Sequence, residues 1–179
     1  TGWQYQVYDG KQLNDSTVEM SLVSPDGDNG FPGTVRATVR YTLTADNAID
    51  ISYEATTDKK TVINMTNHSY FNLNGNPSQH GENQVLYINA DRYTPVDTTY
   101  MPTGQMLKVA GTPMDFRKPT PLSKDINNQR FAMTRNARGF DHNWCLNTWH
   151  NGQPDERAVA ASLYSPQTGI MLQVFTNEP

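Results

Sequence analysis

The sequence is poor in cysteine, in basic residues and in long apolar runs, and each shortage excludes a class of protein. Its single cysteine, Cys145, excludes an internal disulfide and a thiolate-rich metal site. The net charge of −4 provides no basic face for nucleic acid or an anionic membrane. No apolar run approaches the roughly 20 residues that span a bilayer. We therefore expect neither a nucleic-acid nor a membrane partner, and the one free thiol favours a reducing compartment.

The composition is that of a folded, rather polar domain. The 179 residues are 36% hydrophobic and 10% aromatic, which is enough for one domain with its own core. The opening Thr1-Gly2-Trp3 is neither a signal peptide nor an initiator start, which predicts that the numbering begins inside a longer protein. No repeat or interdomain linker is visible, so we expect residues 1–179 to belong to a single domain.

Alternation of apolar and polar residues with a period of two dominates the chain. In the run 34–44, Val35, Val39 and Leu43 fall on one face, while threonines and arginines fill the other. Residues 48–55 alternate again after the polar turn 45–47, which predicts an antiparallel hairpin. Further predicted strands are 3–8, 18–23, 61–65, 85–90, 158–164 and 170–175.

Turn residues separate these strands, and helix signals are few. Eleven prolines and 12 glycines fit a turn-rich chain, and one short helix is predicted over 123–133 with Ser123 as its N-cap. Many short strands at close spacing predict an all-β, antiparallel sandwich or barrel. The last predicted strand, 170–175, has nothing after it to pair with, so we expect an open sheet edge there and an incomplete sandwich.

Two segments contain residue types suited to binding a sugar. Residues 64–73 read Asn-Met-Thr-Asn-His-Ser-Tyr-Phe-Asn-Leu, with His68 among amides and aromatic rings. Rings can pack on the apolar face of a pyranose, amides can bind its hydroxyls, and histidine can transfer a proton at neutral pH. On chemistry alone, a polar turn with a satisfied histidine is the favoured interpretation of this segment.

The second segment, 139–144, reads Gly-Phe-Asp-His-Asn-Trp. The Asp141 carboxylate could accept two hydroxyl hydrogen bonds. Neighbouring side chains of a strand point to opposite faces, so Phe140, His142 and Trp144 should share one face and Asp141 the other. On chemistry alone, an ordinary strand start after a glycine turn is the favoured interpretation.

Other polar clusters carry weaker signals. His80 and His150 lie in polar loop sequence, where we expect them to be solvated. Asp26, Asp28 and Asn29 have calcium-loop residue types but lack the later acidic ligand, so a turn is expected. No metal or cofactor motif is present.

Taken together, these segments resemble the aldose 1-epimerase (galactose mutarotase) family. Residues 64–73 are similar to its central signature. Further similar segments follow in the family's order and cover essentially the whole chain: 30–33, 93–97, 102–104, 109–117 and 139–142.

The resemblance implies a galactose mutarotase-like antiparallel supersandwich that interconverts α and β anomers of aldohexoses without a cofactor. It implies that His68 is the general acid toward the ring oxygen, and that His68, Ser69, Tyr70 and Asp141 contact the sugar. A cytoplasmic enzyme is expected, or a periplasmic one if the parent has a signal peptide.

Parts of the family's site have no match in this chain. An arginine, a second histidine and the glutamate base are missing, and Glu178 does not match that base. We therefore expect missing segments or another chain to complete the domain. Two alternatives stay open: a non-catalytic sugar-binding module, and another carbohydrate-active enzyme of the same fold. A hydrolase would need two carboxylates facing the scissile bond.

Overall fold

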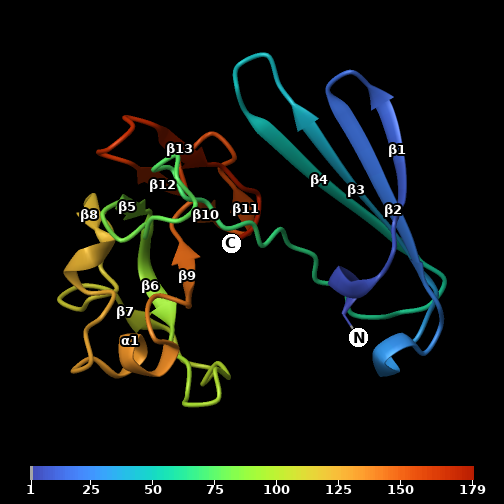
Figure 1. The fold of residues 1–179 in the computed structure, drawn as a ribbon. Coiled ribbons are helices and arrows are strands. Elements are labelled where there is room, and N and C mark those ends of the chain that lie inside the picture. The colour runs from blue at the N-terminus through green and yellow to red at the C-terminus, as the bar shows by residue number, and fades with distance from the viewer. Residues whose placement is uncertain (1) are drawn as a thin grey trace. The chain divides into compact units, whose positions relative to one another are not determined.

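The computed structural model describes residues 2–179, which form two compact units. The first ends at Ser69, and the second runs from Tyr70 to Pro179. Every strand pairing among the described residues is antiparallel, and helices are short (Figure 1). The predicted all-β antiparallel class is therefore confirmed.

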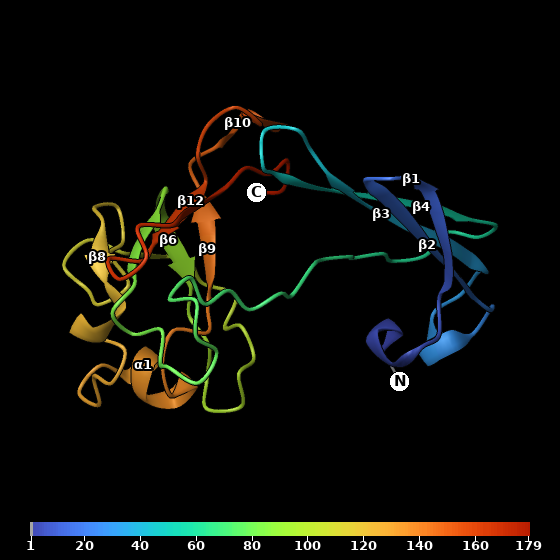
Figure 2. The ribbon, with the colours of Figure 1, turned by 45° about the horizontal axis from the view of Figure 1, so that its top comes forward.

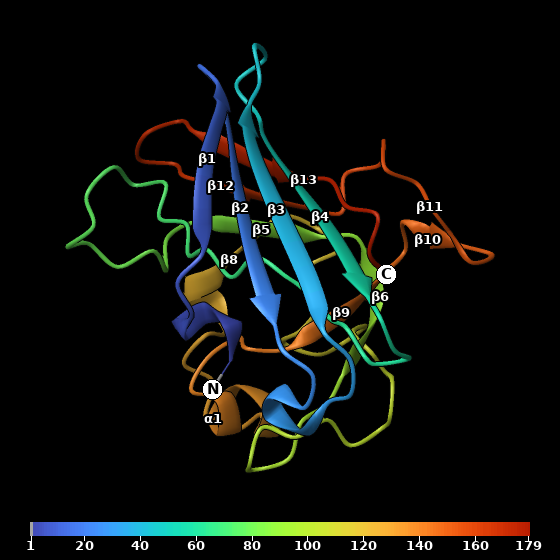
Figure 3. The same ribbon diagram turned by 90° about the vertical axis from the view of Figure 1, so that its right-hand side faces the viewer.

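A four-stranded meander makes up most of the first unit. Its strands follow one another in the order β1-β2-β3-β4, side by side in Figure 3. Of its two 3₁₀ turns, η1 (Trp3–Tyr5) precedes β1 and η2 (Asp28–Gly30) lies between β2 and β3. The strands are β1 (Asp9–Asn14), β2 (Thr17–Ser24), β3 (Val35–Leu43) and β4 (Ile49–Thr57).

The register of this sheet follows from the alternation in its sequence. Val39 of β3 lies opposite Met20 of β2 and Tyr53 of β4, so the apolar positions of three strands share one face. On the other face, Arg40 pairs with Glu19 at 2.6 Å. The predicted hairpin is confirmed, because β3 and β4 pair antiparallel. A slip of one residue in this register would exchange the apolar and the charged face.

Three small sheets make up the second unit (Figure 2). The first has the order β13-β12-β5-β8, the second β7-β6-β9, and β10 pairs with β11. β13 is an edge strand, as expected. The strands are β5 (Val85–Ile88), β6 (Ala90–Thr94), β7 (Leu107–Lys108), β8 (Thr120–Pro121), β9 (Asn143–Leu146), β10 (Trp149–His150), β11 (Gln153–Pro154), β12 (Ala161–Tyr164) and β13 (Met171–Val174).

Two apolar clusters form the core of the second unit. Ile88, Ala90 and Phe116 centre the first, and Tyr93, Val109 and Met114 the second. Phe140 and Trp144 pack against both clusters. The Trp144 indole N–H donates to the Met114 carbonyl at 3.0 Å, which satisfies its polar atom inside the core.

A single residue, Asn89, separates β5 from β6, and the two strands belong to different sheets. Its N–H donates to the Ala160 carbonyl at 2.8 Å, and its carbonyl accepts the Asn147 N–H at 2.8 Å. The one strand predicted over 85–90 is therefore two strands. The N–H of Asn89 bonds to the residue before β12, and its carbonyl bonds to the residue after β9, so the chain passes here from one sheet to the other.

Two predicted strands are wrong. Residues 3–8 contain the turn η1 instead, and the first strand is β1, all of whose residues are exposed. Residues 61–65 form neither a strand nor a helix. Alternation predicts a strand, but pairing needs a neighbour, and none of the described strands pairs with 61–65.

The helix predicted over 123–133 is also wrong. A 3₁₀ turn, η3 (Leu122–Lys124), contains Ser123, and the α-helix α1 (Ala132–Ala137) begins later. Ser123 caps no helix here, because it lies inside η3 and the residue that precedes α1 is Phe131. None of the helices in the described part of the chain has the length and apolar character needed to span a bilayer.

Candidate functional site

Amide side chains fix the signature segment, residues 64–73, at two places. Within the first unit, the Asn67 amide donates to the Tyr41 hydroxyl at 2.9 Å. Its carbonyl oxygen accepts the Ser69 N–H, also at 2.9 Å. One side chain thus ties the backbone on both sides of His68 to the sheet, and His68 and Ser69 are themselves exposed.

The other fixed point lies in the second unit, where buried amides hold the end of the segment. Gln84, 2% exposed, accepts the Leu73 N–H at 2.9 Å. Asn74 accepts the buried Ser165 hydroxyl at 2.7 Å and donates to Asn83 at 2.7 Å. Tyr70, four residues before Asn74, is 90% exposed. The segment is therefore anchored by buried polar contacts while its aromatic ring faces outward.

Asp141 is presented by the turn that follows α1. Arg138 closes the helix in the left-handed conformation, and the Gly139 N–H donates to the Thr134 carbonyl at 2.9 Å. Gly139 itself has φ +143°, which an L side chain rarely adopts. The turn directs Asp141 outward, where it is exposed.

The predicted alternation of side-chain directions at the start of β9 is confirmed. Phe140, His142 and Trp144 lie on the inner face, while Asp141 and Asn143 are exposed. The His142 ring makes edge contacts with Tyr93 and Trp144, each with ring centroids 6.3 Å apart. Burial lowers the pKa of His142 below its ordinary 6.5, and the Asp141 carboxylate opposes this shift.

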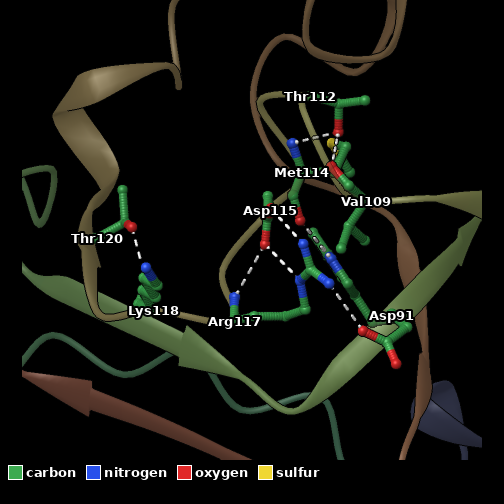
Figure 4. A network of polar contacts seen from close by, with 9 residues as sticks. Asp91, Val109, Thr112, Met114, Asp115, Arg117, Lys118 and Thr120 are labelled. Atoms are coloured by element: carbon green, nitrogen blue, oxygen red, sulfur yellow. Dashed lines mark hydrogen bonds and ion pairs between the residues drawn. The ribbon is translucent and has the colours of Figure 1, made fainter.

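A third polar group lies at the loop between β7 and β8. Arg117 donates to both carboxylate oxygens of Asp115, at 2.9 and 2.8 Å, and to Asp91 at 3.0 Å (Figure 4). These hydrogen bonds raise the pKa of Arg117 and lower that of Asp115. The arrangement joins the loop to β6, and the Arg117 charge is paired with the two carboxylates. We therefore assign these residues a structural role.

The weaker candidates behave as expected. His80 and His150 are exposed, although His150 belongs to β10 and not to a loop. Asp26 accepts the Gly33 N–H at 2.6 Å and pairs with Lys59, as in a turn. Within residues 2–179, no three histidine, cysteine or acidic side chains gather closely enough to hold a metal ion.

The candidate site residues are divided between the units. His68 and Ser69 belong to the first, and Tyr70 and Asp141 to the second. That they share one sugar pocket stays a prediction. The anchors Asn67, Asn74 and Gln84 were missed, because isolated asparagines and glutamines carry no periodic signal in a sequence.

The comparison with protein families decides the relationship. The family model described as "Aldose 1-epimerase" matches residues 2–179. The chain belongs to the aldose 1-epimerase family. It is 41% identical over 169 residues to the aldose 1-epimerase of Escherichia coli (strain K12) and 40% identical over 162 residues to the galactose mutarotase of Homo sapiens.

A solved structure agrees with this family membership. The galactose 1-epimerase of Lactobacillus acidophilus superposes with a TM-score of 0.76 at 35% identity, covering 89% of this chain and 45% of that one. The matches cover 93% of this chain and 46% of the E. coli enzyme, and 90% of this chain and 44% of the human one. The chain thus spans less than half the length of these aldose 1-epimerases.

Proposed function

We propose that this chain contributes acid and sugar-binding residues to an aldose 1-epimerase that interconverts α and β anomers of aldohexoses such as glucose and galactose. The observation that carries the proposal is the unbroken family match over residues 2–179. It supports treating both units as one domain that other segments or another chain complete. The exposed His68 and Asp141 suit contact with a polyol.

His68 acts as the general acid in this proposal. A base removes the proton of the anomeric hydroxyl while the imidazolium protonates the ring oxygen, and the C1–O5 bond breaks to give the aldehyde. Rotation about C1–C2 and reclosure on the other carbonyl face return both protons. An imidazole suits this reversible role because both of its protonation states are accessible near neutral pH. We assign no residue of this chain as the base.

Ser69, Tyr70 and Asp141 bind the sugar. The Asp141 carboxylate accepts hydroxyl hydrogen bonds, and a charged acceptor makes the stronger ones. The Tyr70 ring offers an apolar surface for the C–H face of a pyranose, and Ser69 offers a hydroxyl beside the acid. The proposed compartment is the cytoplasm, for which the free Cys145 is the support.

Polarimetry on freshly dissolved α-D-galactose tests the proposal. It is measured on residues 1–179 and on a chimera in which they replace the matched 46% of the E. coli enzyme. His68→Ala should lower kcat of the chimera by about 10²–10⁴-fold. His80→Ala replaces another exposed histidine and should leave the rate unchanged.

The outcomes separate the competing functions. An active chimera that keeps most of its rate with His68→Ala would refute the role of His68. Saturable galactose binding without faster anomer exchange would identify a sugar-binding module. Release of monosaccharide from a disaccharide would identify a hydrolase, which needs a second carboxylate opposite Asp141.

A further inference from the structure

His142 is a half-buried titratable group to which the proposed reaction gives no role. It lies one residue after Asp141 and directly before β9, with its ring among Tyr93 and Trp144. Tyr93, 2% exposed, comes from β6, so rings from two paired strands border the imidazole.

The two ring nitrogens of His142 have different surroundings. Nδ1 accepts the backbone N–H of Asp141 at 3.2 Å. Nε2 is buried and has no hydrogen-bond partner among the residues that the structure describes. An acceptor at Nδ1 requires the neutral tautomer with its proton on Nε2. A second proton would sit on Nδ1 and face the Asp141 N–H, so this hydrogen bond would be lost.

We propose that His142 is a positioning residue, whose neutral imidazole fixes the backbone of Asp141 and so holds the sugar-binding carboxylate in place. The inference rests on the proposed function through the role of Asp141. It adds that sugar binding weakens when His142 is protonated, although His142 does not touch the sugar.

The groups around the imidazole favour its neutral form at pH 7. Tyr93 is the titratable ring packed against it from β6, and burial raises the pKa of Tyr93, which keeps it uncharged. Trp144 of β9 has no charge. Asp141 is the charged neighbour and favours protonation, but desolvation outweighs it and the pKa of His142 falls. The hydrogen bond should therefore break as the pH drops below 6.5, and not above it.

Two variants separate the hydrogen bond from the packing. His142→Asn places an amide oxygen near the Nδ1 position and cannot titrate, so it keeps the acceptor at every pH. His142→Phe keeps a ring between Tyr93 and Trp144 and removes the acceptor. If His142 acts only through packing, His142→Phe should keep sugar affinity better than His142→Asn. If it positions Asp141 through the hydrogen bond, His142→Asn should keep the affinity better.

NMR spectroscopy on residues 1–179 tests both the hydrogen bond between His142 and Asp141 and its effect on sugar binding. The backbone amide shift of Asp141 should titrate on the acid side of pH 6.5 with the midpoint of the His142 imidazole, and this step should vanish in His142→Asn. A carboxylate titration would persist in His142→Asn, which distinguishes it from this step. In the same samples, the Kd for D-galactose should rise about threefold to tenfold across the step in the wild type, as expected for one hydrogen bond.

The variants complete the test. His142→Phe should show the weakened Kd at all pH values, and His142→Asn the tight one. An Asp141 amide that ignores the His142 midpoint overturns the inference, as does a His142→Phe chain with wild-type amide shift and affinity. Absence of galactose binding at any pH, both in residues 1–179 and in the chimera, would count against the proposed function instead, and the amide titration would still decide whether His142 positions Asp141.

Discussion

Replacing Asn74 with alanine should destabilise the second unit far more than replacing an exposed asparagine. Asn74 is 4% exposed and makes three side-chain hydrogen bonds. Its amide donates to the His80 carbonyl at 3.2 Å and to Asn83 at 2.7 Å, and its oxygen accepts the Ser165 hydroxyl at 2.7 Å. All three disappear in Asn74→Ala.

The expected size follows from these contacts. Each hydrogen bond has a net value of about 0.5–1.5 kcal/mol, and the 3.2 Å bond is the weakest. Ser165 is fully buried, so its hydroxyl proton would lose its acceptor without gaining water. We therefore expect the free energy of unfolding to fall by about 2–4 kcal/mol. Ser165→Ala combined with Asn74→Ala should cost less than the sum, by about 1 kcal/mol.

Urea unfolding monitored by tryptophan fluorescence measures this loss. Trp144 and Trp149 lie in the second unit and Trp3 in the first, so a Trp3→Phe background makes the signal report the second unit alone. Asn127→Ala, an exposed asparagine of the same unit, is the matched control and should change the free energy by less than about 0.5 kcal/mol.

The reasoning would be refuted if Asn74→Ala cost no more than Asn127→Ala. It would also be refuted if the Asn74 and Ser165 changes added without coupling. Either result would mean that the amide network is not what anchors the end of the signature segment.

Three further outcomes are expected. Asp141→Ala should raise the galactose Kd about 10- to 150-fold, because a charged acceptor is lost; calorimetry checks this, and an unchanged Kd contradicts it. Tyr41→Phe should cost about 0.5–1.5 kcal/mol by removing the acceptor of the Asn67 amide, and should speed hydrogen exchange at the Ser69 N–H. The lowered pKa of Asp115 means that its pairing with Arg117 stabilises the fold above pH about 4 and is lost as the pH falls further, so Asp115→Asn should flatten the acid side of the stability profile.

In the first unit, the strands that sequence reading identified are those whose two faces differ. β2, β3 and β4 alternate because one face is apolar and the other carries charges such as Arg40 and Glu19. β1 escaped detection because all of its residues are exposed, so neither face has an apolar pattern. Residues 61–65 alternate without a neighbour to pair with, and local sequence does not encode that neighbour.

The candidate site shows the same division. The outward direction of the Asp141 side chain could be predicted, because the turn at Gly139 and the alternation after it are encoded by adjacent residues. The contacts of Asn67 with Tyr41 and of Asn74 with Ser165 join positions 26 and 91 residues apart. Such pairs depend on the tertiary fold, and an asparagine in a polar stretch gives no sign of its distant partner.

The single residue between β5 and β6 also limits how this chain can change in length. Side chains alternate along a strand, so one residue inserted at Asn89 would reverse the facing of one strand relative to the other. Either Ile88, 8% exposed, or Tyr93, 2% exposed, would then leave the core. The turn at 45–47 joins two strands of one sheet and can lengthen without this penalty. Insertions and deletions among homologues should therefore gather at such turns and spare Asn89.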